Sequence, residues 1–439
     1  MKGFNDRHRR PRAVVVDGCR TPFLRAGGGF SGRTSWQLGA TTFRALLHRT
    51  GLAPTAIDRV LLGSTVLQPD ATNVAREAAF EAGLPASVPA VTLIAAGASA
   101  SEAIARGAAM IEAGEARFVL AGGADCISDP PIGYRPTARR KLFRLSRARG
   151  PAARLRALAA VRPWDLLPDV PRVAERSTGQ TMGAWTEELA DRLGIERQAQ
   201  DAFAVASHRR AAAAREHLAR DIEPTVGAGG RIHSADDGIR ANTDLEQLTR
   251  LRPSFRSRGT LTAGNSSFLT DGAAAVLLAE ERAADEAGLR PLARIVGHVL
   301  TAHDPREDLL LGPVFAISRL LDSLGIELDA VDVVELHEAF AAQVLAVLQL
   351  LADDDVARER LERPRALGSI DPRRLNAWGG SLAIGNPFAP NGARLMTTAC
   401  RRLQVEGGRL ALGATCAGGG LGQAFLLERP SASDPSAAG

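Results

Sequence analysis

Residues 91–127, VTLIAAGASASEAIARGAAMIEAGEARFVLAGGADCI, carry the pattern that decides the fold. An apolar run with β character at 91–94 passes through small residues into a helical pattern of about four turns, which ends at Gly114. A second apolar run at 118–120 follows. This order of strand, helix and strand predicts a βαβ unit, around which the rest of the chain is arranged.

The turn between the first strand and the helix is the expected place for a nucleophile. Ser99 and Glu102 have the S-x-x-E spacing of a capping box, which predicts that the helix starts at Ser99. Gly97 therefore lies on the turn, where free backbone N–H groups and the helix dipole favour negative charge. The residue at this position, however, has no side chain.

Length and composition indicate a globular chain. With 439 residues it can bury a large core and is expected to form roughly two or three lobes. Apolar residues make up 45% and charged residues 23%, proportions typical of a soluble protein. There is no run of about 18 apolar residues, so we expect no transmembrane segment. The first residues, MKGFNDRHRRPR, are basic but are not followed by an apolar core of the length found in a signal peptide, and we therefore expect no secretory signal and a cytoplasmic location.

The four cysteines, Cys19, Cys126, Cys400 and Cys416, are widely spaced. They form no C-x-x-C pair and no pattern of metal ligands, so we expect no metal site. Free thiols in a reducing cytoplasm are expected rather than disulfides. For Cys19, Cys126 and Cys400 the preferred interpretation is an inert, buried thiol, because a free cysteine packs as a small apolar residue.

Positive charge is concentrated in residues 135–162, which hold ten Lys or Arg residues and no Asp or Glu. Such a run is compatible with a solvated surface, a phosphate-binding surface or a patch for an acidic partner. Nucleic acid is not an expected partner, because the segment offers only Phe143, with Tyr134 directly before it, as stacking residues and no recognition motif is present.

Residues 12–125 alternate strand and helix. The apolar periodicity predicts two strands and two helices ahead of the stretch quoted above, the strands at 13–16 and 57–62 and the helices at 36–50 and 72–82. Gly51 follows the first helix as a C-cap. The alternation favours a layer of βαβ units with a mostly parallel sheet.

Residues 126–255 interrupt this rhythm and are interpreted as an excursion lying over the first lobe. They hold the basic segment, a proline-punctuated stretch and two helical patterns, at 181–194 and 197–219. Residues 256–289 then resume the first lobe with a Gly/Asn/Ser turn and a buried strand.

Residues 290–428 repeat the opening pattern. At one offset of 274 residues (for example 325 − 51), matches join Leu46 to Leu320, Gly51 to Gly325 and Ile57 to Val331. Further along, Arg117 aligns with Arg409. Such a duplication predicts two similar halves that stack with their sheets inside, their helices outside and one central pair of helices shared.

Motifs in both halves make the chain resemble one family. They are LAGGADCIS (120–128), DLLPDVPRVAERSTGQTMG (165–183), LTAGNSSFLTDGAAAV (261–276), ELHEAFAAQ (335–343), GGSLAIGNPFAPNGAR (379–394) and TCAGGGLGQA (415–424). Together they closely resemble the thiolases. The nearest branch is the 3-ketoacyl-CoA thiolase (beta) subunit of the trifunctional fatty-acid oxidation complexes, in which HEAF replaces the commoner NEAF.

The resemblance implies the α/β thiolase fold, in which two similar βαβ halves form a layered α/β/α/β/α arrangement with an inserted loop domain that binds coenzyme A. It divides the chain into the first part of the N-terminal half, the loop domain with the basic segment, the completion of that half, and the C-terminal half, at 12–125, 126–255, 256–289 and 290–428. It also implies a homodimer or a dimer of dimers, with a partner enzyme subunit as a further option.

The family's chemistry uses a cysteine thiolate that attacks a 3-ketoacyl-CoA, holds the acyl group and passes it to coenzyme A. A histidine in a GHP triplet activates this cysteine. A second cysteine, in a C-x-G motif near the C-terminus, moves the proton at the enolate carbon, and two oxyanion holes stabilise developing charge. Coenzyme A and acyl-CoA are therefore the implied substrates, and no permanently bound cofactor is expected.

Three catalytic positions of the family are present in this sequence. His337 in HEAF matches the residue that helps bind the thioester oxygen. Cys416 in TCAGGG matches the acid/base cysteine, and Gly418 matches the glycine whose backbone N–H lines an oxyanion hole. A purely structural role stays open for two of them, because His337 could be a core histidine and Cys416 a packed thiol.

Three more positions are expected to bind coenzyme A. Asn265 and Ser266 match the family's GN-S turn, and Glu338 follows the histidine of HEAF. The family also leads us to expect arginines of the basic segment near the coenzyme A phosphates, since guanidinium groups bind phosphate through paired hydrogen bonds. In related complexes this region contacts partner subunits or the membrane surface as well.

The family's nucleophile and its base are both missing. The nucleophilic cysteine falls on Gly97, and the histidine of GHP falls on Asn386 in GNP. Glycine cannot form a thioester, and an amide cannot act as a base near neutral pH. Ser99 and Ser101 lie close to the turn, but no histidine in the sequence neighbourhood would activate either.

Three functions are compatible with these residues. The first is a thiolase-superfamily protein that acts on acyl-CoA or 3-ketoacyl-CoA thioesters without an acyl-cysteine step, using Cys416 and His337 for chemistry at the α-carbon. The second is an orthodox 3-ketoacyl-CoA thiolase (acetyl-CoA C-acyltransferase) of fatty-acid oxidation, which overall similarity favours. The third is an inactive binding or scaffold subunit of a thiolase complex.

Overall fold

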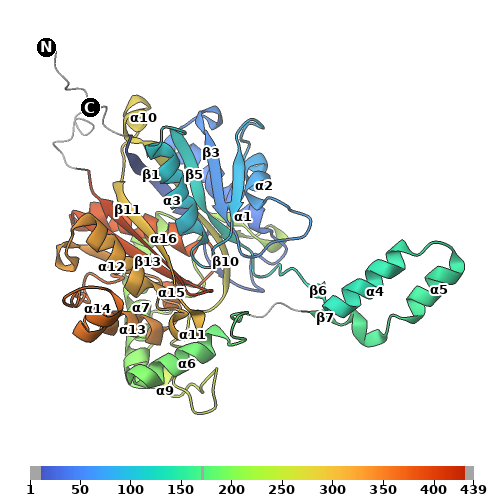
Figure 1. Cartoon of the computed structure of the whole chain (residues 1–439). Helices are drawn as coiled ribbons and strands as arrows, with labels where there is room; N and C mark the ends of the chain where they lie inside the picture. Colours follow the sequence, from blue (N-terminus) through green and yellow to red (C-terminus); the bar gives the residue numbers. More distant parts are fainter. Residues whose placement is uncertain (1–10, 170–172, 431–439) are drawn as a thin grey trace.

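The computed structural model describes residues 11–169 and 173–430. The N-terminal half contains β1 (Ala13–Arg20), β2 (Leu24–Arg25), β3 (Arg59–Gly63), β4 (Ala90–Leu93), β5 (Phe118–Asp125) and β10 (Thr270–Glu280). The C-terminal half contains β11 (Ala293–Ala302), β12 (Val333–Leu336), β13 (Leu410–Ala417) and β14 (Leu421–Glu428). These strands join in the order β12-β13-β14-β11-β1-β10-β5-β3-β4, with β2 paired to β10 (Figure 1).

The sheet is mixed. β3 pairs in parallel with β4 and β5, and β12 pairs in parallel with β13. All the other pairs along the path are antiparallel. The expectation of a mostly parallel layer for residues 12–125 is confirmed, since both strand pairs formed within this range are parallel. The antiparallel strand of this half is β10, which returns after the long excursion, inserts between β1 and β5, and runs opposite to both.

Helices cover the outer faces of both halves and fill the space between them. The outer layers contain α1 (Ser35–Thr50), α2 (Val74–Glu81) and α10 (Glu281–Glu286) on one side, and α12 (Gly312–Leu324) and α13 (Ala341–Leu351) on the other. Between the halves, α3 (Ser99–Glu112) and α16 (Asn391–Glu406) share one buried cluster with strands of both halves (Figure 1). This is the predicted α/β/α/β/α layering with its central pair of helices. Three short helices complete the C-terminal half, α11 (Pro305–Asp308), α14 (Asp354–Arg360) and α15 (Ser381–Ile384).

Matched local structures confirm the duplication. Gly51 and Gly325 each follow the last residue of a helix in the left-handed conformation, with φ of 68° and 64°. The Asp58 carboxylate accepts hydrogen bonds from two backbone N–H groups at the start of β5, and the Asp332 carboxylate does the same at the start of β13. Each half therefore fastens corresponding strands with the same device.

α3 starts at Ser99 as the sequence predicts, but its first turn is not capped in the predicted way. Ser99 is the first helical residue, and the residue before it takes the N-cap position without a side-chain cap. The Ser99 hydroxyl accepts from the N–H of Ala95 (2.9 Å) and donates to the carbonyl of Ala96 (2.6 Å). Glu102 pairs with Arg106 at 2.8 Å. The predicted capping box is therefore wrong, because the Ser99 hydroxyl is used inside the preceding turn.

The excursion packs most of its elements on the body. These are α6 (Met182–Leu193), α7 (Arg197–Ala213), α8 (Arg215–Ala219), β8 (Thr225–Val226), β9 (Ile232–His233) and α9 (Leu245–Thr249). The single helix predicted at 197–219 is broken at Ala214, whose φ of −91° and ψ of 14° are not helical.

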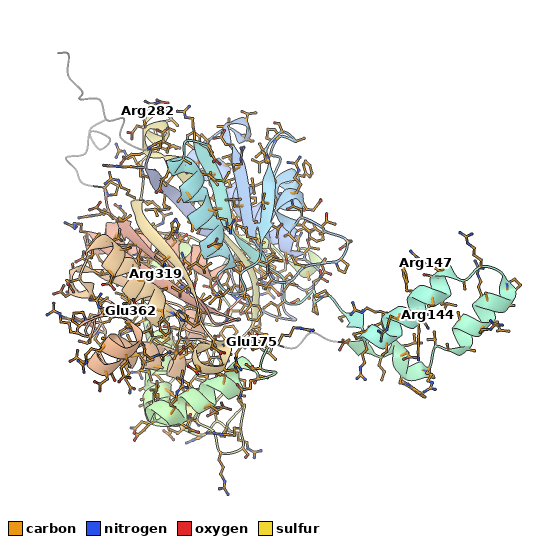
Figure 2. The ribbon with its side chains drawn as sticks, viewed as in Figure 1. Arg144, Arg147, Glu175, Arg282, Arg319 and Glu362 are labelled. Atoms are coloured by element: carbon orange, nitrogen blue, oxygen red, sulfur yellow. The ribbon has the colours of Figure 1, made fainter. Side chains whose placement is uncertain are left out.

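The basic segment forms an arm, which we define as residues 133–169. It consists of β6 (Gly133–Tyr134), α4 (Pro136–Arg147), α5 (Pro151–Ala159) and β7 (Pro168–Asp169). The arm projects away from the body, and Arg144 and Arg147 lie far from it (Figures 1 and 2). Neither these helices nor any other helix in the described ranges is both long enough and apolar enough to cross a membrane.

Candidate functional site

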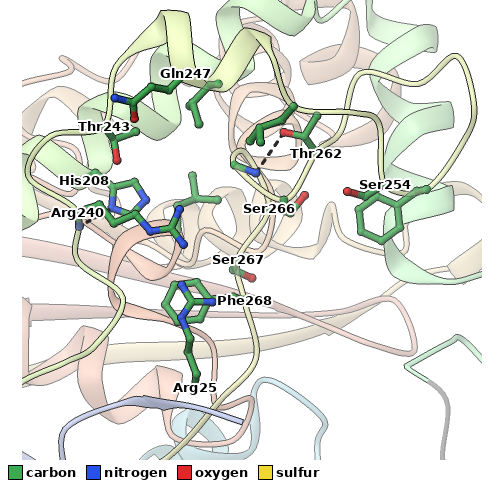
Figure 3. Close-up of a pocket in the computed structure, with 16 residues that line it drawn as sticks. Arg25, His208, Arg240, Thr243, Gln247, Ser254, Thr262, Ser266, Ser267 and Phe268 are labelled. Atoms are coloured by element: carbon green, nitrogen blue, oxygen red, sulfur yellow. Dashed lines mark hydrogen bonds between the residues drawn. The ribbon is translucent and has the colours of Figure 1, made fainter. Parts of the chain in front are cut away.

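A cavity of about 470 Å³ is lined by segments that are far apart in the chain (Figure 3). Its wall takes Arg25 from β2, His208 from α7 and Leu382 from α15, together with residues from the stretches 240–255 and 262–268. Arginines and hydroxyls line the cavity, and none of the described lining residues is Asp or Glu. A concave site of this chemistry fits an anionic ligand that also carries uncharged polar groups.

The positive charge of the cavity comes from Arg25 and Arg240. The Arg25 guanidinium stacks over the Phe268 ring at 4.1 Å. His208 Nδ1 accepts a hydrogen bond from the Arg240 N–H at 3.2 Å. Burial, with the charges of both arginines, lowers the pKa of His208 to about 4. The imidazole is therefore neutral at physiological pH, and the two guanidinium groups attract an anion such as phosphate.

Ser266 and Ser267 supply hydroxyl groups to the same cavity. Ser266 is 8% exposed, and its Oγ has no hydrogen-bond partner among the described residues. A buried hydroxyl without a partner indicates a place where a ligand or water completes the hydrogen bonding. Ser266 is thus the one predicted coenzyme A-binding residue that lines the cavity.

The loops that carry the predicted catalytic residues are joined by backbone hydrogen bonds. The N–H of Ser267 donates to the carbonyl of Ala339 at 3.0 Å, which joins the GN-S turn to the HEAF loop. The N–H of Ala100 donates to the carbonyl of Ala389 at 3.2 Å, which joins the start of α3 to the GNP loop. The bridges between Ser266 and Phe340 and between Leu269 and Asn386 connect these two pairs, so the loops lie next to one another.

The turn expected to hold the nucleophile keeps an unusual backbone. Ala96 has a φ of 47°, a left-handed conformation that residues with a side chain rarely adopt. Gly97 follows it, is partly exposed, and lies against the backbone of Cys416. Strained backbone of this kind is common at functional sites. The turn is present, although no side chain projects from Gly97.

His337 is almost fully buried directly after β12. Its Nδ1 lies 3.0 Å from Ser381 Oγ, to which Arg394 Nη2 donates at 3.3 Å. Because a guanidinium group can only donate, Ser381 Oγ accepts the hydrogen bond from Arg394. Burial and the Arg394 charge lower the pKa of His337 to about 3, so the ring is neutral at physiological pH. A neutral imidazole of this kind can donate a hydrogen bond to an oxyanion.

Cys416 lies near the end of β13 and is 3% exposed. Burial raises the pKa of its thiol to about 12, so the group is protonated at neutral pH. A protonated thiol is suited to giving a proton to a carbanion and poorly suited to nucleophilic attack. Gly418 follows the strand and is partly exposed, and the next N–H, that of Gly419, donates to the Glu175 carboxylate at 2.8 Å.

Asn386 occupies the position of the family's base and is 7% exposed. Its Nδ2 donates to Ser267 Oγ at 3.1 Å, so the amide reaches a residue of the cavity wall. Its Oδ1 accepts from the Phe388 N–H at 3.1 Å and from Asn391 Nδ2 at 2.7 Å. An amide bonded in this way orients its neighbours and does not take up a proton.

Asn265 and Glu338, also expected to bind coenzyme A, are fully buried and do not line the cavity. Asn265 Nδ2 donates to Asp201 at 2.9 Å. Glu338 accepts from Asn376 and from Ser207, both at 2.7 Å. The structure therefore gives both side chains hydrogen bonds that hold the loops together, in place of the ligand contact expected from the sequence.

The alternative nucleophiles near the turn have no activating base. The Ser99 hydroxyl is bonded within the turn, and Ser101 Oγ is buried without a hydrogen-bond partner among the described residues. Cys19, Cys126 and Cys400 are fully buried in the apolar core, which confirms their interpretation as packed thiols.

Sequence reasoning missed the cavity's charged residues. It directed attention to the basic segment 135–162, but none of the residues of that segment lines the cavity, and the arm stands apart from it. Arg25 and Arg240 converge from β2 and from the excursion, although they are far apart in the chain. No local pattern marks either arginine, because only the tertiary fold brings them together.

Comparison with protein families matches almost the whole chain. The family model described as "Thiolase, N-terminal domain" matches residues 13–282, and "Thiolase, C-terminal domain" matches residues 289–429. The chain is 42% identical over 421 residues to a 3-ketoacyl-CoA thiolase of Erwinia tasmaniensis, covering 95% of this chain and 96% of that protein. It is 38% identical over 417 residues to the mitochondrial trifunctional enzyme subunit beta of Bos taurus, covering 94% and 88%.

Solved structures show the same likeness. The chain matches the Bacillus anthracis acetyl-CoA acetyltransferase with a TM-score of 0.82 and 29% identity, over 96% of this chain and 99% of that one. It matches human mitochondrial 3-ketoacyl-CoA thiolase, solved in complex with CoA, with a TM-score of 0.79 and 31% identity, over 96% and 98%. The mixed α/β architecture described above is therefore the architecture of those proteins.

Proposed function

Because this chain belongs to the thiolase family, we propose that it binds coenzyme A thioesters in the cavity and acts on them at the α-carbon without an acyl-cysteine step. The two cavity arginines would hold phosphate groups of coenzyme A, and the hydroxyls of Ser266 and Ser267 would contact its uncharged part. Coenzyme A is a substrate in this proposal and not a permanently bound cofactor.

The observation that carries the proposal is the absence of a side chain at Gly97. A covalent acyl-enzyme requires a thiol or hydroxyl next to a base, and the position of the family's base is occupied by the amide of Asn386. Enolate stabilisation depends on other groups, which are present. His337 would donate a hydrogen bond from its ring N–H to the thioester oxygen, and the Cys416 thiol would give a proton to the α-carbon. Such a site could support a retro-aldol-like cleavage, a decarboxylation or a direct condensation.

A second candidate is orthodox thiolysis of 3-ketoacyl-CoA by coenzyme A. The names of the relatives favour it, since the Erwinia tasmaniensis protein is called a 3-ketoacyl-CoA thiolase and shares 42% identity. The residues at positions 97 and 386 count against it, because they supply neither sulfur nor imidazole. A third candidate, an inactive binding or scaffold subunit, would bind coenzyme A thioesters weakly or not at all.

One experiment separates the three candidates. The purified protein is mixed with acetoacetyl-CoA and coenzyme A, loss of the enolate absorbance is followed, and intact mass after incubation with acetyl-CoA reports any acyl adduct. The proposal expects binding of acetyl-CoA without an adduct and without thiolysis. Thiolysis at an ordinary enzymatic rate, with an acyl adduct, would establish the orthodox function. Failure to bind any coenzyme A ligand would favour the scaffold.

We also propose a homodimer that forms through the edge of β4. Within the described residues β4 pairs with β3 alone, so its other edge offers unpaired backbone groups. Val91 and Ile94 on this segment are 49% and 63% exposed, and Phe80 on the adjacent α2 is 47% exposed. An apolar strand edge of this kind is suited to pairing with the same edge of a second copy.

A further inference from the structure

We propose that Asn391, Asn386 and Ser267 form a relay of hydrogen bonds that makes the Ser267 hydroxyl a donor to a carbonyl oxygen of the bound ligand. The inference rests on the proposed binding of coenzyme A thioesters in the cavity. It goes further by assigning the amides at positions 386 and 391 a positioning role, with Ser267 as the group that touches the ligand.

The orientation of the two amides follows from backbone groups that can bond in one way only. The Phe388 N–H donates to one side-chain atom of Asn386 at 3.1 Å, so that atom must be the oxygen. The Phe388 carbonyl accepts from one side-chain atom of Asn391 at 3.1 Å, so that atom must be the nitrogen. The same nitrogen donates to Asn386 Oδ1 at 2.7 Å, and the two assignments therefore agree.

This orientation leaves the NH₂ group of Asn386 facing Ser267. Asn386 Nδ2 donates to Ser267 Oγ at 3.1 Å, which occupies the hydroxyl as an acceptor. The Ser267 proton must then point elsewhere, and Ser267 lines the cavity. In Figure 3 the labelled Ser267 lies in the cavity wall between Ser266 and Phe268.

A second, independent observation points to a ligand at this place. The neighbouring Ser266 is 8% exposed, lines the same cavity, and its Oγ lacks a hydrogen-bond partner in the part of the chain that the structure describes. Two adjacent hydroxyls, one with its proton directed away from Asn386 and one without a partner, fit a ligand oxygen. The acceptor would be an uncharged carbonyl, which a coenzyme A thioester offers in its pantetheine amides and in its thioester.

The relay is tested by a double-mutant cycle on ligand affinity. Dissociation constants of acetyl-CoA, coenzyme A and S-ethyl-CoA, which lacks the thioester oxygen, are measured by calorimetry for the wild type and for Asn386→Asp, Asn391→Ala and Ser267→Ala. Asn386→Asp and Asn391→Ala are each measured again in the Ser267→Ala background. An aspartate at position 386 only accepts, so Ser267 would turn its proton away from the ligand.

We expect Asn386→Asp to weaken acetyl-CoA binding about tenfold, because the hydrogen bond from Ser267 to an uncharged ligand oxygen is lost. Asn391→Ala should weaken acetyl-CoA binding by less. In the Ser267→Ala background neither substitution should weaken binding further. If Asn386→Asp leaves the affinity for S-ethyl-CoA unchanged, the acceptor is the thioester oxygen. If it lowers the affinity for all three ligands equally, the acceptor is a pantetheine amide. Either pattern supports the relay.

Two other outcomes overturn it and can be told apart. If Asn386→Asp weakens ligand binding equally with and without the Ser267 hydroxyl, the relay is rejected and coenzyme A binding stands. Simple charge repulsion by the introduced carboxylate would give this result. Absence of binding of all three ligands to the wild type rejects the coenzyme A proposal and the relay with it. Thermal unfolding shows whether each variant is folded. If Asn391→Ala does not fold, the cycle of Asn386→Asp with Ser267→Ala still decides between the outcomes.

Discussion

A Cβ atom built on Gly97 would lie 3.1 Å from the carbonyl oxygen of Cys416, and the next nearest atoms, in Ala417, would be 3.8 Å away. The backbone φ of Gly97 is not in the left-handed region. A side chain at this position therefore needs a shift of only a few tenths of an ångström in one carbonyl group. The turn therefore leaves open most of the space that a side chain would occupy.

The double substitution Gly97→Cys with Asn386→His is expected to acquire an acyl-enzyme. The new thiol would project from the turn at the start of α3, and the imidazole would replace an amide that cannot act as a base. After incubation with acetyl-CoA, intact mass should show one acetyl group on the double variant and none on the wild type. Gly97→Ser with Asn386→His is the matched control with a weaker nucleophile. No adduct on either double variant would show that the site has diverged beyond these two positions.

His337 is expected to make the protein less stable as the pH falls. In the unfolded chain a histidine takes up a proton near its ordinary pKa of 6.5, whereas the buried ring stays neutral down to a pKa of about 3. The contribution of the neutral, buried ring to the free energy of unfolding is therefore fully present above the unfolded-state pKa of 6.5. It is lost as the pH falls from there toward the folded-state pKa. At pH 5 the loss amounts to about 2 kcal/mol.

Urea unfolding of the wild type and of His337→Asn at pH 7.5 and pH 5 measures this effect. The variant should lose about 2 kcal/mol less than the wild type over that interval. His48→Asn, a substitution at an exposed histidine, is the control for removing a histidine at the surface. A pH dependence that is the same in His337→Asn and in the wild type would contradict the buried neutral state.

Coenzyme A affinity should depend on the cavity arginines and not on the arm. Arg240→Ala is expected to weaken coenzyme A binding about tenfold, because a charge-assisted hydrogen bond to phosphate is lost. The effect should shrink as salt is added. The matched control is the pair Arg139→Ala and Arg140→Ala on α4, which are exposed and do not line the cavity. Equal weakening by the control pair would show that the arm folds over the ligand.

Ile94→Asp is expected to convert the proposed homodimer to a monomer. The side chain is 63% exposed beside the free edge of β4, and a carboxylate there would be buried without a partner in a dimer. Sedimentation velocity at micromolar concentration gives the mass directly. Val405→Asp, at a 48% exposed position near the end of α16, controls for the added charge. A wild type that sediments as a monomer, or a dimer that survives Ile94→Asp, would contradict the proposed edge.

The sequence pattern predicted helices and strands well where residues close together in the chain determine them. The helix expected at 36–50 is α1, Ser35–Thr50, because its apolar stripe and the following Gly51 are both short-range features. The offset of 274 residues was visible for the same reason, since each half repeats its own helix end and strand start. Ser99 shows the limit of such patterns. Its S-x-x-E spacing fits a capping box, but the hydroxyl found nearer partners in the turn.

The sequence pattern could not predict how strands that are far apart in the chain pair with one another. Nothing in the apolar runs told whether β10 would lie parallel or antiparallel to β5, because strand direction depends on the path of the intervening 144 residues (270 − 126). The basic segment was prominent in the sequence, yet it forms the arm and leaves the cavity to Arg25 and Arg240.

The amino-acid sequence alone determined the family of this protein and the absence of a thiol at position 97 and of an imidazole at position 386, because these are identities of single residues within ordered motifs. Only the tertiary structure decided which residues line the cavity, which way the Asn386 amide is oriented, and that the His337 ring is neutral. Those properties depend on hydrogen-bond partners such as Ser267, Ser381 and Arg394, which folding brings from separate segments of the chain.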